Sequence, residues 1–456
     1  MPPFALTSTL SRPVARLGTL ALRSRSPIQT PHYAANTSRG VVPHLAHDNL
    51  QKHTDIRALY LGLEDFIEKT PPRVPPVFEI HPDSTGSRLR AFTHHSPAPL
   101  LILGPRRVPP VESPAANTNA TLSICTSVGF RTLDIEEYIS AGAALQPDII
   151  IAPGDIVPPT SSRKRAEKST DRTDLWVSTM LTRAQETPYP AVFAPLLPLA
   201  PEQQMWYTQL LCDPDYRPHI SGLAVYDTES LLDLPEELQL LPRLALTTPA
   251  NPVAILREIA LGVDLFILPF VDHASDAGFA LDFTFPAPAP APHADPLPLA
   301  TSLWSAEHTI DLSPLRPGCT CFACTNHHRA YIHHLLATKE MLGWVLLQLH
   351  NHSVMSEFFA GVRQSIARET FEADVEAFSR AYEADMPSAA GPGPRVRGYQ
   401  FKSKGHGEPK ANPKAYNKLD DMAENIADAT MPDPDIDAEE LQEHGLGKAL
   451  EDEEMK

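Results

Sequence analysis

Short apolar segments alternate with helix-like segments through the first 285 residues of this 456-residue chain. The apolar segments have strand length, are rich in Ile, Val, Leu or Phe, and end at Pro, Gly or Asp. We predict strands at residues 100–103, 122–126, 148–152, 191–195, 221–226, 244–247, 263–268 and 279–283. Helices are predicted between several of them, at residues 133–144, 162–182, 202–211 and 252–262. Apolar strands that alternate with helices are typical of parallel strands buried on both faces.

Eight strand–helix units in fewer than 300 residues favour a (β/α)8 TIM barrel, in the α/β class, over an open parallel sheet. We therefore expect a barrel body over residues 1–285. Residues 286–310 begin with a proline-rich stretch that cannot form helix or ladder hydrogen bonds at its prolines, and we expect an exposed loop there. Helical spacing of apolar residues then predicts two or three closing helices within residues 311–385.

Charged residues are unevenly distributed along the chain, whose net charge is −18. Seven basic residues and one acidic residue lie between Arg395 and Lys418, and 14 acidic residues and two lysines lie between Leu419 and Lys456. This composition predicts a disordered tail over residues 386–456, basic first and then acidic. The body is acidic too, which disfavours a protein that holds nucleic acid by phosphate neutralisation alone. No apolar run approaches the roughly 18–20 residues of a membrane span, so no transmembrane segment is expected.

Three of the five cysteines lie within six residues, in the pattern C-x-C-x-x-C at Cys319, Cys321 and Cys324. Thiolates this close can turn toward one Zn²⁺ ion, which needs four tetrahedral sulfur or nitrogen ligands. His350 lies at the end of a long helical stretch that could fold back onto the cysteines, so we predict it as the fourth ligand. A closed Cys3His site leaves no position for water, and one structural zinc ion is therefore expected. The alternatives are three reduced thiols without a metal, or a thiol redox pair.

The segment from Cys319 to Leu335 resembles the zinc motif of the tRNA-guanine transglycosylases, in which C-x-C-x-x-C precedes R-A-Y-[IL]-H-H-L. His350-Asn351 falls where that family has an H-N pair. Other segments resemble family motifs in the same order, namely Arg16–Gly18, Thr30-Pro31, Leu223–Val225 and Gly262–Phe266. The resemblance covers residues 12–370 and implies a barrel with a zinc-binding subdomain. It also disfavours a mitochondrial transit peptide, which the acid-free first 47 residues would otherwise suggest.

The residues that carry the chemistry of this family are missing. Its enzymes exchange guanine for a deazaguanine at the tRNA wobble position, through an aspartate that attacks the ribose. The resemblance places Ile267 at that aspartate. It places Gly104-Pro105-Arg106-Arg107 in the loop of a second aspartate, and Gly154, beside Asp155, at the base-recognition aspartate. The pattern resembles the non-catalytic members of the family, which are accessory subunits paired with a catalytic chain.

The resemblance thus implies a heterodimer in which this chain has no catalytic residue and supports exchange of guanine for queuine at position 34 of tRNAs with GUN anticodons. Family barrels dimerise through zinc-side helices, so we expect the interface around residues 331–359. The chain reaches tRNA through the complex, and the candidates for phosphate contact, against the alternative of plain surface charge, are Arg106, Arg107, Arg163, Lys164, Arg165 and Lys168.

Two other functions stay as alternatives. One is an autonomous base-exchange enzyme that uses a substitute acid such as Asp264 or Asp272. The other is a free nucleic-acid-binding zinc module, which the acidic body disfavours. A cytoplasmic location is expected, and peripheral association with the mitochondrial outer membrane stays open.

Overall fold

The structure is a computed structural model that describes residues 4–7, 15–22, 25–68, 73–113, 115–186, 188–288, 295–389 and 391–394. Apart from the turn at 127–129, these residues belong to one unit. From residue 395 onward the predicted tail lies outside the described residues, as do residues 289–294 of the predicted proline-rich loop.

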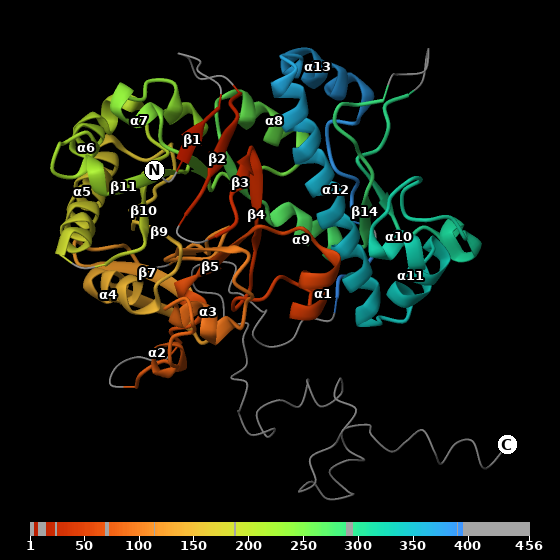
Figure 1. Cartoon of the computed structure of the whole chain (residues 1–456), viewed down its shortest axis with the longest axis horizontal. Helices are drawn as coiled ribbons and strands as arrows, with labels where there is room; N and C mark the ends of the chain where they lie inside the picture. Colours follow the sequence, from red (N-terminus) through yellow and green to blue (C-terminus); the bar gives the residue numbers. More distant parts are fainter. Residues whose placement is uncertain are drawn as a thin grey trace, which may run out of the picture. The chain divides into compact units, whose positions relative to one another are not determined.

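Eight parallel strands close into a barrel (Figure 1), in the spatial order β10-β11-β12-β13-β4-β5-β6-β9. The predicted TIM barrel is therefore confirmed. The strands are β4 (His32–Asn36), β5 (Ala58–Gly62), β6 (Leu100–Gly104), β9 (Ile149–Ile151), β10 (Ala191–Leu196), β11 (Ile220–Val225), β12 (Arg243–Ala245) and β13 (Leu265–Ile267).

Two of the eight predicted strands lie outside the barrel. β7 (Thr121–Thr126) pairs with β8 (Gly129–Asp134), and β14 (Phe279–Leu281) pairs antiparallel with β15 (Ala300–Ser302). The first two barrel strands, β4 and β5, were not among the predicted segments. An apolar run predicts an extended, buried segment, but it contains no information about the sheet in which that segment pairs.

The helices that surround the barrel follow the predicted alternation after β9. α5 (Arg163–Glu186), α6 (Met205–Leu211) and α8 (Pro252–Ala260) each lie between consecutive barrel strands. α4 (Ile135–Leu145) precedes β9, and α9 (Pro269–Asp276) follows β13. The shorter helices are α1 (His47–His53), α2 (Pro76–Glu79), α3 (Arg88–Thr93) and α7 (Glu236–Gln239). No described helix combines the length and the apolar character that crossing a membrane requires.

Apolar side chains fill the barrel interior. Tyr60, Ile102, Phe193 and Ile267 belong to one buried cluster, because alternate residues of each strand point inward. Three antiparallel strands close the N-terminal end, namely β1 (Phe4–Leu6), β2 (Gly18–Leu20) and β3 (Ile28–Thr30), and their apolar residues join the same cluster.

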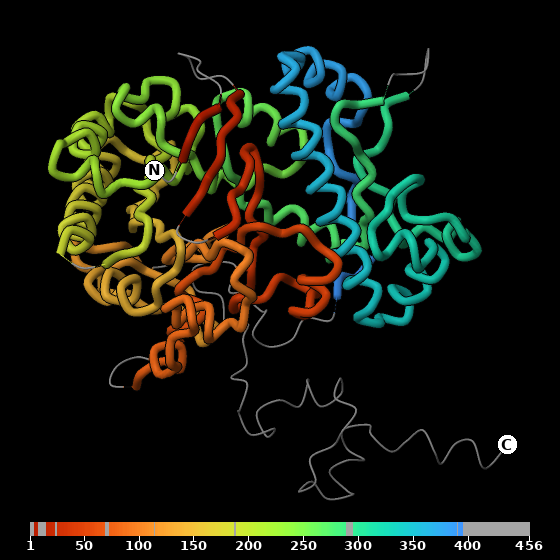
Figure 2. Tube along the Cα trace, in the orientation of Figure 1, coloured from red at the N-terminus to blue at the C-terminus, as the bar shows by residue number. Residues whose placement is uncertain are grey.

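The C-terminal helices pack against the side of the barrel where its first and last strands meet. They are α10 (Phe322–Asn326), α11 (Arg329–Ala337), α12 (Met341–Ala367) and α13 (Phe371–Ala381). α12 lies beside β4 and α9, and Figure 2 shows its blue tube next to the red N-terminal strands. The Tyr33 hydroxyl lies 3.1 Å from Nδ1 of His352, so a buried polar contact joins two segments more than 300 residues apart.

Candidate metal centre and barrel mouth

Cys319, Cys321, Cys324 and His350 come together in one buried cluster whose ligand atoms all lie within 4.8 Å of one another. The three sulfur atoms lie 3.8, 3.5 and 3.4 Å from Nδ1 of His350. A tetrahedral zinc ion, with Zn–S of about 2.3 Å and Zn–N of about 2.0 Å, requires sulfur–nitrogen separations of about 3.5 Å. The four side chains therefore fit a tetrahedral metal ion.

The cysteines are presented by a turn that leads into a short helix. Gly318 has a φ of +76°, in the left-handed region that favours glycine, and it turns the chain just before Cys319. Cys321 is the N-cap of α10, and its sulfur accepts a hydrogen bond from the backbone N–H of Cys324 at 3.4 Å. The C-x-C-x-x-C spacing thus places one sulfur before the helix start, one at its cap and one in its first turn.

His350 is oriented by strand β14. Its Nε2 atom lies 2.9 Å from the Leu281 carbonyl oxygen, to which it donates, so Nδ1 is left to face the sulfur atoms. The next residue, Asn351, accepts a hydrogen bond from the Leu281 backbone N–H at 2.9 Å and donates to the Phe279 carbonyl at 3.0 Å. The H-N pair therefore combines a candidate ligand with a residue that holds α12 against the strand.

The cluster also has the electrostatics of a cation site. Hydrogen bonds from Cys321 and Cys324 hold the pKa of Cys319 well below that of an ordinary thiol, which favours a thiolate. Burial opposes protonation of His350, but its hydrogen bonds with Cys319 and Cys324 raise its pKa to about 9. A metal ion would take the place of protons among these groups.

At the mouth of the barrel, the position expected for a nucleophile is apolar. Ile267 is the last residue of β13, is fully buried, and packs in the interior cluster with Tyr60, Ile102 and Leu246. An isoleucine side chain has no atom that can attack a sugar carbon or balance a positive charge.

Ion pairs and hydrogen bonds inside the protein hold the loop after β6 in place. The backbone N–H and Nε of Arg107 donate to Glu64 at 2.9 and 2.6 Å, and its guanidinium also lies 3.1 Å from Asp65. Burial raises the pKa of Glu64, although Arg107 opposes that rise. Arg106 donates to the Ser123 carbonyl at 2.9 Å. Both guanidinium groups, predicted as phosphate contacts, thus have partners inside the protein.

The carboxylate of Asp155 accepts hydrogen bonds from three side chains, two of which are arginines. Its carboxylate is fully buried and accepts from Arg165 at 2.7 and 2.8 Å, from Arg172 at 3.0 Å and from Asn117 at 2.7 Å. Burial alone would raise the pKa of Asp155, but hydrogen bonds from Arg165, Asn117 and Arg172 hold it below its usual range. Arg165, another predicted phosphate contact, is therefore also engaged internally. The exposed basic residues at the start of α5 are Arg163, Lys164 and Lys168.

The substitute acids of the alternative enzyme lie elsewhere. Asp264 is fully buried before β13, at the opposite end of that strand from Ile267, and it pairs with Arg16. Asp272 lies on α9 and accepts a hydrogen bond from Gln348 of α12 at 2.7 Å. Both carboxylates therefore take part in contacts that hold elements together, and the autonomous enzyme is not favoured.

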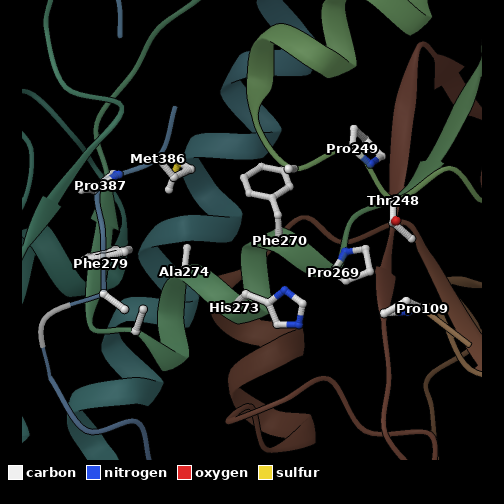
Figure 3. Close-up of a pocket in the computed structure, with 13 residues that line it drawn as sticks. Pro109, Thr248, Pro249, Pro269, Phe270, His273, Ala274, Phe279, Met386 and Pro387 are labelled. Carbon is white, nitrogen blue, oxygen red and sulfur yellow. The ribbon is translucent and has the colours of Figure 1, made fainter. Parts of the chain in front are cut away.

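A pocket of about 370 Å³, which the sequence did not predict, lies beside α9 at the edge of the mouth. Figure 3 shows Phe270 and His273 between the Thr248–Pro249 loop and the Met386–Pro387 segment. Among the described residues that line the pocket there is no carboxylate, and His273 is the one titratable side chain. Met386 also packs against the main core, so folded structure extends past the predicted start of the tail.

Comparison with known proteins agrees with the geometry. The family model described as queuine tRNA-ribosyltransferase matches residues 11–384. The chain is similar to the protein named queuine tRNA-ribosyltransferase accessory subunit 2 of Schizosaccharomyces pombe, with 33% identity over 87% of this chain and 88% of that protein. Proteins of the same name from Anopheles gambiae and Xenopus tropicalis are each 27% identical, over 80% and 77% of this chain and 87% and 93% of their own lengths. The chain therefore belongs to the queuine tRNA-ribosyltransferase family.

Proposed function

We propose that this chain is the non-catalytic subunit of a heterodimeric queuine tRNA-ribosyltransferase. In that complex the catalytic chain exchanges guanine for queuine at the wobble position of tRNA, and this chain supports the exchange. The names of the related proteins support a role as an accessory subunit. The observation that carries the proposal is the buried Ile267 at the end of β13, because a displacement at the ribose needs a carboxylate at that position.

The Cys3His cluster is proposed to hold one structural zinc ion. Four protein ligands complete a tetrahedral shell, so no position is left for a reacting water molecule. The ion would join α10 to α12 through Cys324 and His350, and the hydrogen bond from His350 would extend that link to β14. Its role is to stabilise the subdomain.

The interface with the catalytic subunit is proposed on the zinc-side helices. Large apolar side chains are exposed on the segment before α10 and at the start of α12, and Ile310 is 86% exposed. α11 packs against both of these segments, so the exposed residues lie around one helix. Exposed apolar residues gathered in this way are typical of protein–protein contacts. The residues are Ile310, Leu312, Met341 and Leu342.

Contact with tRNA phosphates is proposed for the exposed start of α5, at Arg163, Lys164 and Lys168. Lys164 and Lys168 form no ion pair with a described residue, whereas Arg163 pairs with Glu167 at 2.9 Å in an exposed contact of little strength. Arg106, Arg107 and Arg165, which have internal partners, are proposed to shape this side of the mouth.

The test is a base-exchange assay with labelled guanine and a tRNA that has G at the wobble position. The full chain alone, the catalytic relative alone and their mixture are compared. We expect incorporation only when the catalytic relative is present, with the highest rate in the mixture. Turnover by this chain alone would contradict the proposal, as would a mixture no more active than the catalytic relative by itself.

A further inference from the structure

A groove of about 380 Å³ runs between α5 and α6, on the other side of the barrel from α10 and α11 (Figure 1). At its edge stands Trp206, whose side chain is 76% exposed and makes no stacking contact with another described aromatic ring. An indole left so open to water is unusual on a folded surface, because burying it against a partner is favourable. The adjacent residue Met205 is also exposed.

Three carboxylates line the same groove, and no basic side chain is among the described residues that line it. Asp171 and Asp174 come from α5, and Asp213 follows α6. None of the three forms an ion pair with a described residue. Burial and the neighbouring Asp171 raise the pKa of Asp174, so the unbalanced negative charge has an energetic cost that a bound cation would relieve.

An open aromatic face beside carboxylates is suited to a guanidinium or ammonium group. The cation can lie over the indole while the carboxylates accept its hydrogen bonds. A free amine would leave most of Trp206 and the adjacent Met205 uncovered, whereas a peptide can cover them with its own backbone and side chains. RNA is excluded on charge, because phosphates would meet the three carboxylates.

We infer that the α5–α6 groove is a docking site for a basic, arginine- or lysine-bearing segment of a partner protein. One basic side chain stacks on Trp206, with its charged group among Asp171, Asp174 and Asp213. The site is separate from the metal cluster and the exposed zinc-side residues, and it includes none of the proposed tRNA contacts at the start of α5, so the inference does not rest on the proposed function.

The experiment measures binding of a fluorescein-labelled, twelve-residue peptide with arginine at every third position and alanine elsewhere, by anisotropy, to the full chain. We expect saturable binding that Trp206→Ala weakens by at least about threefold, the lower end of a cation–π contact. The pair Asp171→Asn and Asp174→Asn should weaken it further, by about tenfold. The matched control is Asp233→Asn with Glu236→Gln, two exposed acids outside the groove, and it should leave the affinity unchanged.

Several results would overturn the inference. They are absence of peptide binding, an equal loss in the control pair, and direct binding of tRNA that Trp206→Ala weakens. A full-length variant with the seven basic residues between Arg395 and Lys418 changed to glutamine supplies a further check. If the peptide bound only to that variant, the basic tail of this chain would be the occupant of the groove in the parent protein. A partner protein would then be the wrong occupant. If the chain formed a dimer and Trp206→Ala dissociated it, the occupant of the groove would be a second copy of the chain.

Discussion

His350 and Leu281 are joined through the imidazole Nε2 atom, which lies 2.9 Å from the Leu281 carbonyl oxygen. Asn351 adds a second bond to the same residue by accepting from the Leu281 N–H at 2.9 Å. Two bonds from adjacent residues of α12 to one strand residue fix the position of the helix along β14. The ring of His350 is thereby aimed at the cysteines.

Loss of a metal ligand should release the ion and loosen the subdomain. We expect Cys321→Ser or His350→Ala to abolish stoichiometric metal and to lower the melting temperature by on the order of 5–10 °C, because ion binding is coupled to folding. Metal content and thermal unfolding are the measurements, and Cys212→Ser, outside the cluster, is the control. A variant without metal that still bound its partner normally would refute the structural role.

A carboxylate introduced at position 267 should not give this chain base-exchange activity. Ile267→Asp places an acid among Tyr60, Ile102 and Leu246, where its charged form is poorly solvated. We expect no base exchange and a loss of about 3–5 kcal/mol in the free energy of unfolding. The loss should grow as the pH rises, since burial raises the pKa of a carboxyl and the folded state then favours the protonated form. Urea unfolding at pH 5 and pH 8 measures this, and Ile267→Val should cost only about 1 kcal/mol.

Glu258 on α8 should make stability depend on pH near neutrality. Burial, aided by Asp227 and opposed by a hydrogen bond from Thr247, raises the pKa of Glu258 to about 7. Because the folded-state pKa lies above the unfolded one, this carboxyl contributes stability below the unfolded pKa, and that contribution is lost as the pH rises through about 7.

Glu258→Gln should therefore match the parent at pH 5 and be more stable by about 1–2 kcal/mol at pH 8. Denaturant unfolding at the two pH values gives the difference. The exposed Glu236→Gln serves as control and should change stability at neither pH. A variant equally or less stable at pH 8 would show that Glu258 ionises normally.

Charges on the zinc-side surface should separate the two subunits. Met341→Glu with Leu342→Glu puts two carboxylates where apolar contact is proposed, and we expect at least a tenfold weaker heterodimer. The single chain should keep its melting temperature, because Met341 is largely exposed. Co-purification and analytical ultracentrifugation measure assembly. Leu240→Glu, an exposed leucine after α7, is the control, and an equal loss there would place the interface elsewhere.

The start of α5 should contribute to tRNA affinity through charge alone. Changing Arg163, Lys164 and Lys168 to glutamine should weaken tRNA binding by the assembled complex and reduce the slope of log affinity against log salt by about 2–3. A filter-binding series at several salt concentrations measures both. The same changes at Lys52, Arg73 and Arg257, which are exposed elsewhere, should have little effect. An unchanged slope in the first variant would remove α5 from the RNA-binding surface.

Local signals in the sequence predicted the barrel architecture and the metal cluster. Strand-length apolar runs alternate with helical spacing because parallel strands are covered by helices on the outside and packed residues on the inside. The cysteines and His350 were predictable because tetrahedral ligation needs close thiolates from one turn and one more ligand from a helix that folds back. β4 was missed because its segment is rich in alanine and has a weak pattern, whereas the apolar run of β5 was a signal that could have revealed that strand.

The internal partners of the arginines could not be predicted from local signals in the sequence. Arg106, Arg107 and Arg165 were candidates for phosphate contact or plain surface charge in the sequence, yet they contact Ser123, Glu64 and Asp155, residues from other strands and loops.

The amino-acid sequence alone was enough to predict the barrel and the cysteine–histidine set. These features follow from residue type and spacing along the chain. The folded structure was needed to show which strands enter the barrel, which arginines are engaged internally, and that Trp206 stands exposed beside Asp171 and Asp174. Those outcomes depend on contacts between distant segments, whose energies are set by burial and geometry that exist only once the chain has folded.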